Sequence, residues 1–206
     1  MFLSVFDIFK IGVGPSSSHT MGPMLAAERF LSDLQGGAEL IPGSGAPAAL
    51  AASLHGSLAF TGKGHATDRA VFLGFCGFRP DTLDPTAAET ALSALRENRS
   101  ITAKGLGELK FDPETDLVFD YGAPLPGHAN GMILRAFDAA GNPCYTETYY
   151  SVGGGFVLTE AELAAQAQDD RDLHAEKVDS GFPYPFGQAL EMLDMARASG
   201  KSIAVM

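Results

Sequence analysis

The chain has 206 residues, of which 46% are hydrophobic and 19% are charged, and its formal net charge is −11. This length and apolar content suit one to one and a half globular domains and argue against a disordered chain. The acidic balance, without any basic run, argues against nonspecific nucleic-acid binding. No apolar run reaches the roughly 18–20 residues of a membrane span, and the N-terminus lacks the features of a signal peptide. We therefore expect a cytoplasmic protein with neither nucleic-acid nor membrane partners.

In the first half of the chain, apolar periodicity predicts a short helix over 4–10 and a longer helix from about Thr20 to Gln35. The longer helix has an apolar stripe of Met24, Ala27, Phe30, Leu31 and Leu34. A strand is expected over 48–60 because Leu54, Gly56, Leu58 and Phe60 alternate, although the alanines there also permit a helix. A second glycine-rich turn then leads into a helix from Thr67 to about Phe75.

In the second half, Thr86 is the predicted N-cap of a helix over 87–98, with Glu89 in the capping-box position. Short strands are expected over 108–111 and 117–121, and a hairpin of strands over 128–137 and 144–151 that resumes at 156–158. A short acidic helix starts at Thr159, a polar surface loop covers 165–181, and a last helix ends at Gly200 after a stripe formed by Phe186, Ala189, Leu190, Leu193 and Ala196. This mixture predicts an α+β fold with helices layered on a sheet.

The most informative stretch is Gly12-Val13-Gly14-Pro15-Ser16-Ser17-Ser18-His19-Thr20, which leads directly into a helix. Pro23 belongs in a first helical turn, which places the N-cap near Thr20. Unpaired N–H groups with hydroxyls and an imidazole beside them suit a small anionic ligand. Ordinary capping accounts for one such hydroxyl, whereas three consecutive serines followed by His-Thr exceed what a cap needs.

Three histidines lie in similar loops. His19 and His65 each precede a helix, and His65 follows the glycine-rich Gly62-Lys63-Gly64. His128 and Asn130 are expected on one side of a strand start, because residues i and i+2 share a face. The structural alternatives are solvated histidines and a turn asparagine before glycine. The full phosphate-loop pattern, the dinucleotide GxGxxG pattern and the GxSxG nucleophile elbow are all absent, and the histidine spacing forms no zinc motif.

These residues resemble one known family. The blocks Ser4-Val5-Phe6-Asp7 and Gly12 to Met24 look like the opening of iron–sulfur-dependent L-serine dehydratases. The resemblance continues in family order over nearly the whole chain, with Gly56-Ser57-Leu58, Thr61-Gly62-Lys63-Gly64-His65-x-Thr67-Asp68, Leu125-Pro126, His128-x-Asn130-Gly131-Met132, Thr148-Tyr149-Tyr150-Ser151-x-Gly153-Gly154-Gly155-Phe156 and Tyr184-Pro185-Phe186. Together these blocks are specific, although each one alone is not.

The resemblance is to the N-terminal β domain of the single-chain enzymes. It implies a mixed sheet similar to the allosteric-substrate-binding domain of some phosphoglycerate dehydrogenases. Residues 1–183 would form the β domain, and 184–206 a helix leading into a C-terminal iron–sulfur domain, which agrees with the apolar end of the sequence. That domain's cysteines would hold a [4Fe–4S] cluster, since this chain has only Cys76 and Cys144, too few to hold one alone. A homodimer is also expected.

The implied reaction is loss of water from L-serine to give pyruvate and ammonia. It needs a base for the Cα proton and a Lewis acid for the departing hydroxide. The implied catalytic residues are Ser17, His19, His65 and His128, with no single one assigned as the base. The implied substrate-binding residues are Ser16, Ser18, Thr20, Lys63, Asn130 and Ser151. The chain itself would hold no metal. The alternatives are a regulatory module that binds a small anion or amino acid without activity of its own and, less well supported, a serine hydrolase.

Overall fold

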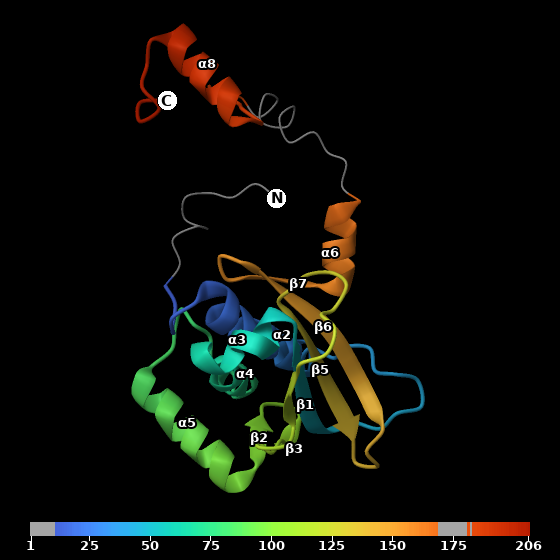
Figure 1. Ribbon diagram of the computed structural model, residues 1–206. Coiled ribbons are helices and arrows are strands. Elements are labelled where there is room, and N and C mark those ends of the chain that lie inside the picture. The colour runs from blue at the N-terminus through green and yellow to red at the C-terminus, as the bar shows by residue number, and fades with distance from the viewer. Residues whose placement is uncertain (1–10, 169–180, 182) are drawn as a thin grey trace. The chain divides into compact units, whose positions relative to one another are not determined.

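The computed structural model describes residues 11–168, 181 and 183–206 (Figure 1). The chain divides into two compact units, Met1–Ala164 and Ala165–Met206. The helix expected over 4–10 and most of the loop expected over 165–181 lie outside the described residues. The division expected at residue 183 stays a prediction.

A mixed seven-stranded sheet forms the centre of the first unit, which confirms the α+β expectation. Its hydrogen-bonded order is β2-β3-β1-β5-β6-β7, and β4 pairs with β1 beside β3. β1 runs parallel to β3 and β4 and antiparallel to β5. The strands are β1 (Pro47–His55), β2 (Ser100–Ala103), β3 (Gly107–Lys110), β4 (Leu117–Asp120), β5 (Gly131–Asp138), β6 (Pro143–Gly153) and β7 (Phe156–Thr159).

The register of β1 and β5 places buried side chains directly opposite one another on one face of the sheet. The pairs are Leu50 with Ala136, Ala52 with Leu134 and Leu54 with Met132, all of them buried. This face packs into one apolar core with the helices. The sequence did not predict β2, a four-residue strand that follows directly on a helix.

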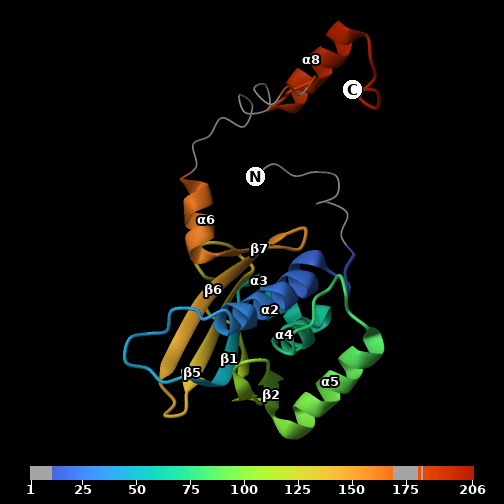
Figure 2. The same cartoon turned by 180° about the vertical axis from the view of Figure 1, so that it is seen from behind.

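The helices of the first unit are η1 (Ser17–Met21, a π-helical turn), α2 (Gly22–Gln35), α3 (Ser57–Thr61), η2 (Gly62–His65, a 3₁₀ turn), α4 (Thr67–Phe75) and α5 (Pro85–Asn98). α6 (Glu160–Ala167) spans the division at Ala164. α2 packs against β5, β6 and β7, and α4 lies beside it (Figure 2). The predicted apolar stripe of α2 is buried. The two helix backbones approach closely at Gly74, where an added Cβ would lie 2.3 Å from the carbonyl oxygen of Met24.

The second unit contains α8 (Ala189–Ser199), which ends at Gly200 as predicted. The predicted apolar stripe on this helix is not a buried face: in the part of the chain that the structure describes, α8 buries none of its residues.

The strand expected over 48–60 is wrong beyond His55. Gly56 has φ 55° and ψ −129°, a conformation that side-chain-bearing residues avoid, and the chain turns there into α3. A Cβ at this position would lie 2.4 Å from the carbonyl oxygen of Ala129. The alternation of Leu54, Gly56, Leu58 and Phe60 therefore ends at a turn, although it continues in the sequence.

Two predicted caps are also wrong. Asp84 caps α5 in place of Thr86, because its carboxylate accepts a hydrogen bond from the N–H of Ala87 at 2.7 Å. Glu89 forms an ion pair with Arg69 and not a capping box.

α2 itself follows Met21, which makes no side-chain cap bond. The N-cap of η1, the turn before it, is Ser16 and not Thr20. It has extended backbone angles, and its hydroxyl accepts a hydrogen bond from the N–H of His19 at 3.2 Å. The π-helical turn η1 lies between Ser16 and Pro23. A helix start inferred from Pro23 alone therefore falls at Thr20, later in the chain than the actual cap.

Candidate active site

His19 and His65 come together although 46 positions separate them in the chain. Their ring centroids lie 4.9 Å apart, with 39° between the ring planes. His19 lies in η1, just before α2, and His65 ends η2, just before α4. Because α2 and α4 pack side by side, their two preceding turns meet. π-helical turns such as η1 are frequent at functional sites.

Two hydroxyls join the histidine-bearing turns. Thr20 donates a hydrogen bond to the carbonyl oxygen of His65 at 2.9 Å, and Thr67 donates one to the carbonyl oxygen of His19 at 2.5 Å. Both threonines are buried. These reciprocal bonds fix the backbones that carry the two rings.

Both ring nitrogens of His19 face hydroxyls. Nδ1 lies 2.9 Å from Oγ of Ser18, and Nε2 lies 3.0 Å from Oγ of Ser57. Burial lowers the pKa of His19 below its usual 6.5, and the nearby charge of His65 lowers it further. The ring is therefore favoured in its neutral form, with one nitrogen donating and the other accepting.

His65 has one ring nitrogen bound and one free. Its Nδ1 lies 2.9 Å from the carbonyl oxygen of Thr61, which can only accept a hydrogen bond. In the neutral ring the proton is therefore on Nδ1, and Nε2 carries a lone pair. Nothing in the described part of the chain bonds to this Nε2. His65 is half-buried, so the lone pair is positioned to accept a proton from a bound molecule.

The remaining serines of the first loop have separate surroundings. Oγ of Ser16 lies 3.4 Å from Oγ of Ser18, and the two form a short chain leading to His19. Ser17 is exposed, and its hydroxyl has no hydrogen-bond partner among the described residues. The hydroxyl of Ser17 is thus open to a ligand.

His128, Asn130 and Ser151 form a second group. His128 and Asn130 precede β5, so the expectation that they share a strand face is wrong. Nδ1 of His128 accepts a hydrogen bond from the N–H of Asn130 at 3.1 Å, and the amide of Asn130 donates to the carbonyl oxygen of Ser151 at 3.0 Å. The carbonyl oxygen of Ala129, between them, accepts from the N–H of Ser57 at 2.8 Å, which links this group to the histidine pair.

The side chains of two predicted site residues lie apart from the histidine pair. The hydroxyl of Ser151 is fully buried, has no hydrogen-bond partner among the described residues, and packs against Gly22, where an added Cβ would lie 2.0 Å from Oγ. The ammonium of Lys63 lies over the ring of Phe119, 5.5 Å from its centroid. Neither side chain contacts the His19–His65 pair within the described part of the chain.

Sequence reasoning assigned no role to Ser57, Thr61 or Thr67. Ser57 and Thr61 bond directly to the two imidazoles, and Thr67 fixes the backbone of His19. The available signal was Gly56-Ser57, a glycine followed by a hydroxyl, in a run over 48–60 whose other polar residues are Ser53 and His55.

The chain's own cysteines do not fit an iron–sulfur cluster. Cys144 is fully buried, and burial raises the pKa of its thiol. Burial also raises the pKa of Cys76, to about 11. Cluster ligands are thiolates, which these environments disfavour. Among the described residues no group of three or more His, Cys, Asp or Glu side chains could hold a metal ion. None of the described helices is long and apolar enough to cross a membrane.

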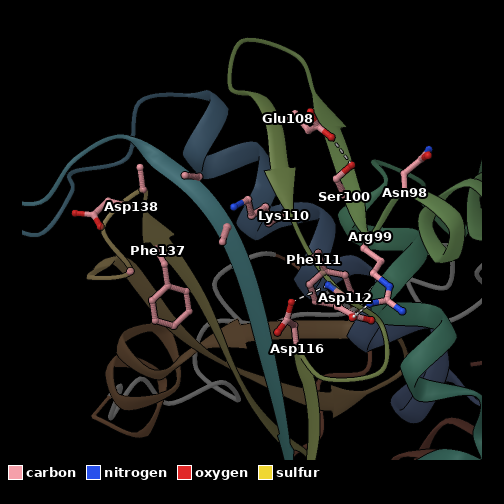
Figure 3. Close-up of a pocket in the computed structure, with 14 residues that line it drawn as sticks. Asn98, Arg99, Ser100, Glu108, Lys110, Phe111, Asp112, Asp116, Phe137 and Asp138 are labelled. Carbon is pink, nitrogen blue, oxygen red and sulfur yellow. Dashed lines mark hydrogen bonds and ion pairs between the residues drawn. The ribbon is translucent and has the colours of Figure 1, made fainter.

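A separate cavity of about 810 Å³ opens between the end of α5 and the strands β1, β3 and β5 (Figure 3). Two cations lie in its wall: Arg99, which pairs with Asp112 at 3.2 Å, and Lys110, which has no ion-pair partner in the described part of the chain. Phe111 and Phe137 supply apolar surface. No predicted site residue lines this cavity.

Comparison with known proteins gives consistent matches. The sequence model of the family described as serine dehydratase beta chain matches residues 4–162. An L-serine dehydratase of Helicobacter pylori is 41% identical over 201 residues, which are 98% of this chain and 41% of that protein. An L-serine dehydratase of Streptomyces coelicolor is 42% identical over 206 residues, 100% of this chain and 43% of that protein. L-serine dehydratase 1 of Escherichia coli is 36% identical over 203 residues, 98% of this chain and 41% of that protein. The chain thus spans about two fifths of the length of these relatives.

Proposed function

Because the chain belongs to the serine dehydratase beta-chain family, we propose that it supplies part of the active site of an enzyme that converts L-serine into pyruvate and ammonia. The observation that supports this most directly is the His19–His65 pair, in which one imidazole has both nitrogens occupied and the other keeps a free Nε2. α-Proton removal requires such a lone pair beside the bound substrate.

His65 is the proposed base. Its Nε2 accepts the Cα proton of L-serine, and the bond from Nδ1 to the carbonyl oxygen of Thr61 stabilises the resulting imidazolium. Loss of the β-hydroxyl completes the elimination of water, and the enamine product then tautomerises and takes up water to give pyruvate and ammonia. His19 remains neutral beside His65, because two adjacent imidazolium rings repel each other.

The substrate is proposed to bind between the two groups of residues. Ser17 and Ser18 offer hydroxyls to its carboxylate. His128 presents Nε2–H, since its Nδ1 accepts a hydrogen bond, and Asn130 holds the loop that carries it. Ser16, Thr20 and Ser151 contribute through the backbone and helix positions that they fix, and Lys63, within η2, adds positive charge.

A [4Fe–4S] cluster is proposed to lie outside this chain, since Cys76 and Cys144 do not fit it. Its cysteine ligands would belong to a C-terminal iron–sulfur domain, corresponding to the length of the relatives that this chain does not cover. We also propose that the enzyme works as a cytoplasmic homodimer.

The test is anaerobic production of pyruvate from L-serine, by this chain alone and by the protein with the iron–sulfur domain restored. Activity is expected only in the restored protein. There, His65→Ala should lower kcat by about 10²–10⁴-fold, the usual contribution of a general base. The matched control is His55→Gln, which removes a buried histidine held by Ser53 and Asp120 away from the pair. Retention of activity in His65→Ala within about threefold of the control would refute the assignment of the base.

A regulatory function is the second candidate, and the separate cavity favours it. Its volume lies in the range of small-molecule sites, and Lys110 offers an unpaired cation for a carboxylate or phosphate. Titration of the chain with L-serine and with inorganic phosphate, followed by NMR, tests it: shifts confined to the cavity and abolished by Lys110→Ala would support regulation, and their absence would exclude it.

A serine hydrolase is not supported. Ser57 and His19 do form a hydroxyl–imidazole pair, but Nδ1 of His19 faces the hydroxyl of Ser18 and not a carboxylate. A hydrolase triad needs an acid there to stabilise the imidazolium.

A further inference from the structure

Ser57 lies where three segments of the candidate site meet. It is the first residue of α3, directly after the turn at Gly56. Its hydroxyl lies 3.0 Å from Nε2 of His19, its N–H donates to the carbonyl oxygen of Ala129, and its own carbonyl oxygen accepts from the hydroxyl of Thr61 at 2.8 Å. Ser57 therefore contacts the η1 turn, the loop before β5 and the residue whose carbonyl binds His65.

The bond from Ser57 decides what His19 can do. A neutral imidazole has one N–H donor and one lone pair, whereas a hydroxyl can donate or accept. With hydroxyls of Ser18 and Ser57 at both nitrogens, the lone pair of His19 is already used. Without the Ser57 hydroxyl, Nε2 of His19 would be free, and both imidazoles of the pair, with centroids 4.9 Å apart, would have a nitrogen without a hydrogen-bond partner.

We propose that Ser57 is a positioning residue that holds Nε2 of His19 and so leaves Nε2 of His65 as the free lone pair of the pair. The catalytic role of Ser57 rests on the proposed function, whereas its contact with His19 does not. Ser57 needs no contact with the substrate in this role, because it acts through the orientation and tautomer of His19.

The experiment uses the 206-residue chain labelled with ¹⁵N at histidine. Long-range ¹H–¹⁵N spectra at about pH 7.5 report which ring nitrogen carries the proton, and His19→Gln and His65→Gln variants assign the signals. In the wild type, His65 is expected as the Nδ1–H tautomer and His19 with both nitrogens hydrogen-bonded. In Ser57→Ala, the ¹⁵N chemical shifts of the two His19 ring nitrogens should move towards the averaged values of a ring that exchanges between its two neutral tautomers. Unchanged His19 signals in a folded Ser57→Ala chain would overturn the proposal.

The fold supplies a matched control. Oγ of Ser53 lies 2.9 Å from Nε2 of His55, the same kind of pair only four residues earlier in the chain. Ser53→Ala should shift the signals of His55 and leave those of His19 unchanged. A shift of His19 in Ser53→Ala as large as that in Ser57→Ala would mean that the response is general and would overturn the proposal.

A second pair of variants covers the case in which Ser57→Ala does not fold. Ser57→Thr and Ser57→Val have nearly the same shape and differ by a hydroxyl in place of a methyl group. Threonine should preserve the wild-type His19 signals, and valine should shift them; identical spectra would overturn the proposal. The dehydration assay is a separate readout. If the restored wild-type enzyme makes no pyruvate but Ser57→Val shifts the His19 signals, the proposed function fails and the positioning contact stands.

Discussion

Replacement of Gly56 by alanine tests the turn on which the candidate site depends. At φ 55° and ψ −129° an alanine costs about 1–3 kcal/mol of backbone strain. Its Cβ would also lie 2.4 Å from the carbonyl oxygen of Ala129, a backbone atom that cannot move without weakening its hydrogen bond from Ser57, worth about 1 kcal/mol. Gly56→Ala should therefore lower the free energy of unfolding by about 2–4 kcal/mol, a large part of the 5–15 kcal/mol typical of a domain.

Urea denaturation of the chain, followed by circular dichroism, measures this loss, and two other glycines separate its causes. Gly37 has φ 83° with no atom within 4 Å of an added Cβ, so Gly37→Ala should show strain alone, about 1–2 kcal/mol. Gly64 has neither positive φ nor a close atom, so Gly64→Ala should change stability by less than about 0.5 kcal/mol. A loss in Gly56→Ala no larger than that in Gly37→Ala would refute the argument from the contact with Ala129.

Three further results are expected. Because folding lowers the pKa of His19, the imidazole binds a proton more readily in the unfolded chain, and the free energy of unfolding should fall as the pH drops below about 6.5. His19→Gln should reduce this dependence of stability on pH, measured by urea titrations at several pH values. An unchanged dependence would contradict the prediction. The pKa of Glu162 is lowered to about 2, chiefly by its hydrogen bonds from Arg29, so the ionised carboxylate stabilises the fold above pH 4.5 and this stabilisation is lost as the pH falls from there towards 2. Because the Arg29–Glu162 pair is well exposed and screened by solvent, Glu162→Gln at neutral pH should cost only about 1 kcal/mol of stability. The loss should be seen as faster amide exchange in α6, and unaltered exchange would count against it. The thiols of Cys76 and Cys144 should react slowly with a disulfide reagent at about pH 8 in the native chain, because their burial disfavours the thiolate, and should react fully in denaturant. Fast reaction in the native chain would show that these thiols are accessible and would contradict the prediction.

The secondary structure was most predictable where local signals act alone. The helix over 67–75 and the burial of the α2 stripe follow from apolar periodicity, and the structure confirms both. The strand expected to reach Phe60 ends at His55 because a contact with Ala129, more than 70 residues away, coincides with the turn at Gly56. Periodicity within the strand carries no information about such a contact.

The candidate site shows the same limit. The sequence singled out both His19 and His65 from their positions before helices, but their approach to 4.9 Å depends on the packing of α2 against α4. The bond of Ser57 to His19 joins residues 38 positions apart, and no local pattern marks it. Proton positions on the two rings follow only once their partners are known.

The close contact between Gly74 and the backbone of Met24 has a consequence for motion. With no side chain between them at this point, α2 and α4 have little freedom to slide or separate without steric overlap. The turns that carry His19 and His65 are continuous with these helices, so the two rings are expected to move as one body. Fluctuations that change the distance from this pair to a substrate or to another domain should therefore leave the distance between the imidazoles almost constant.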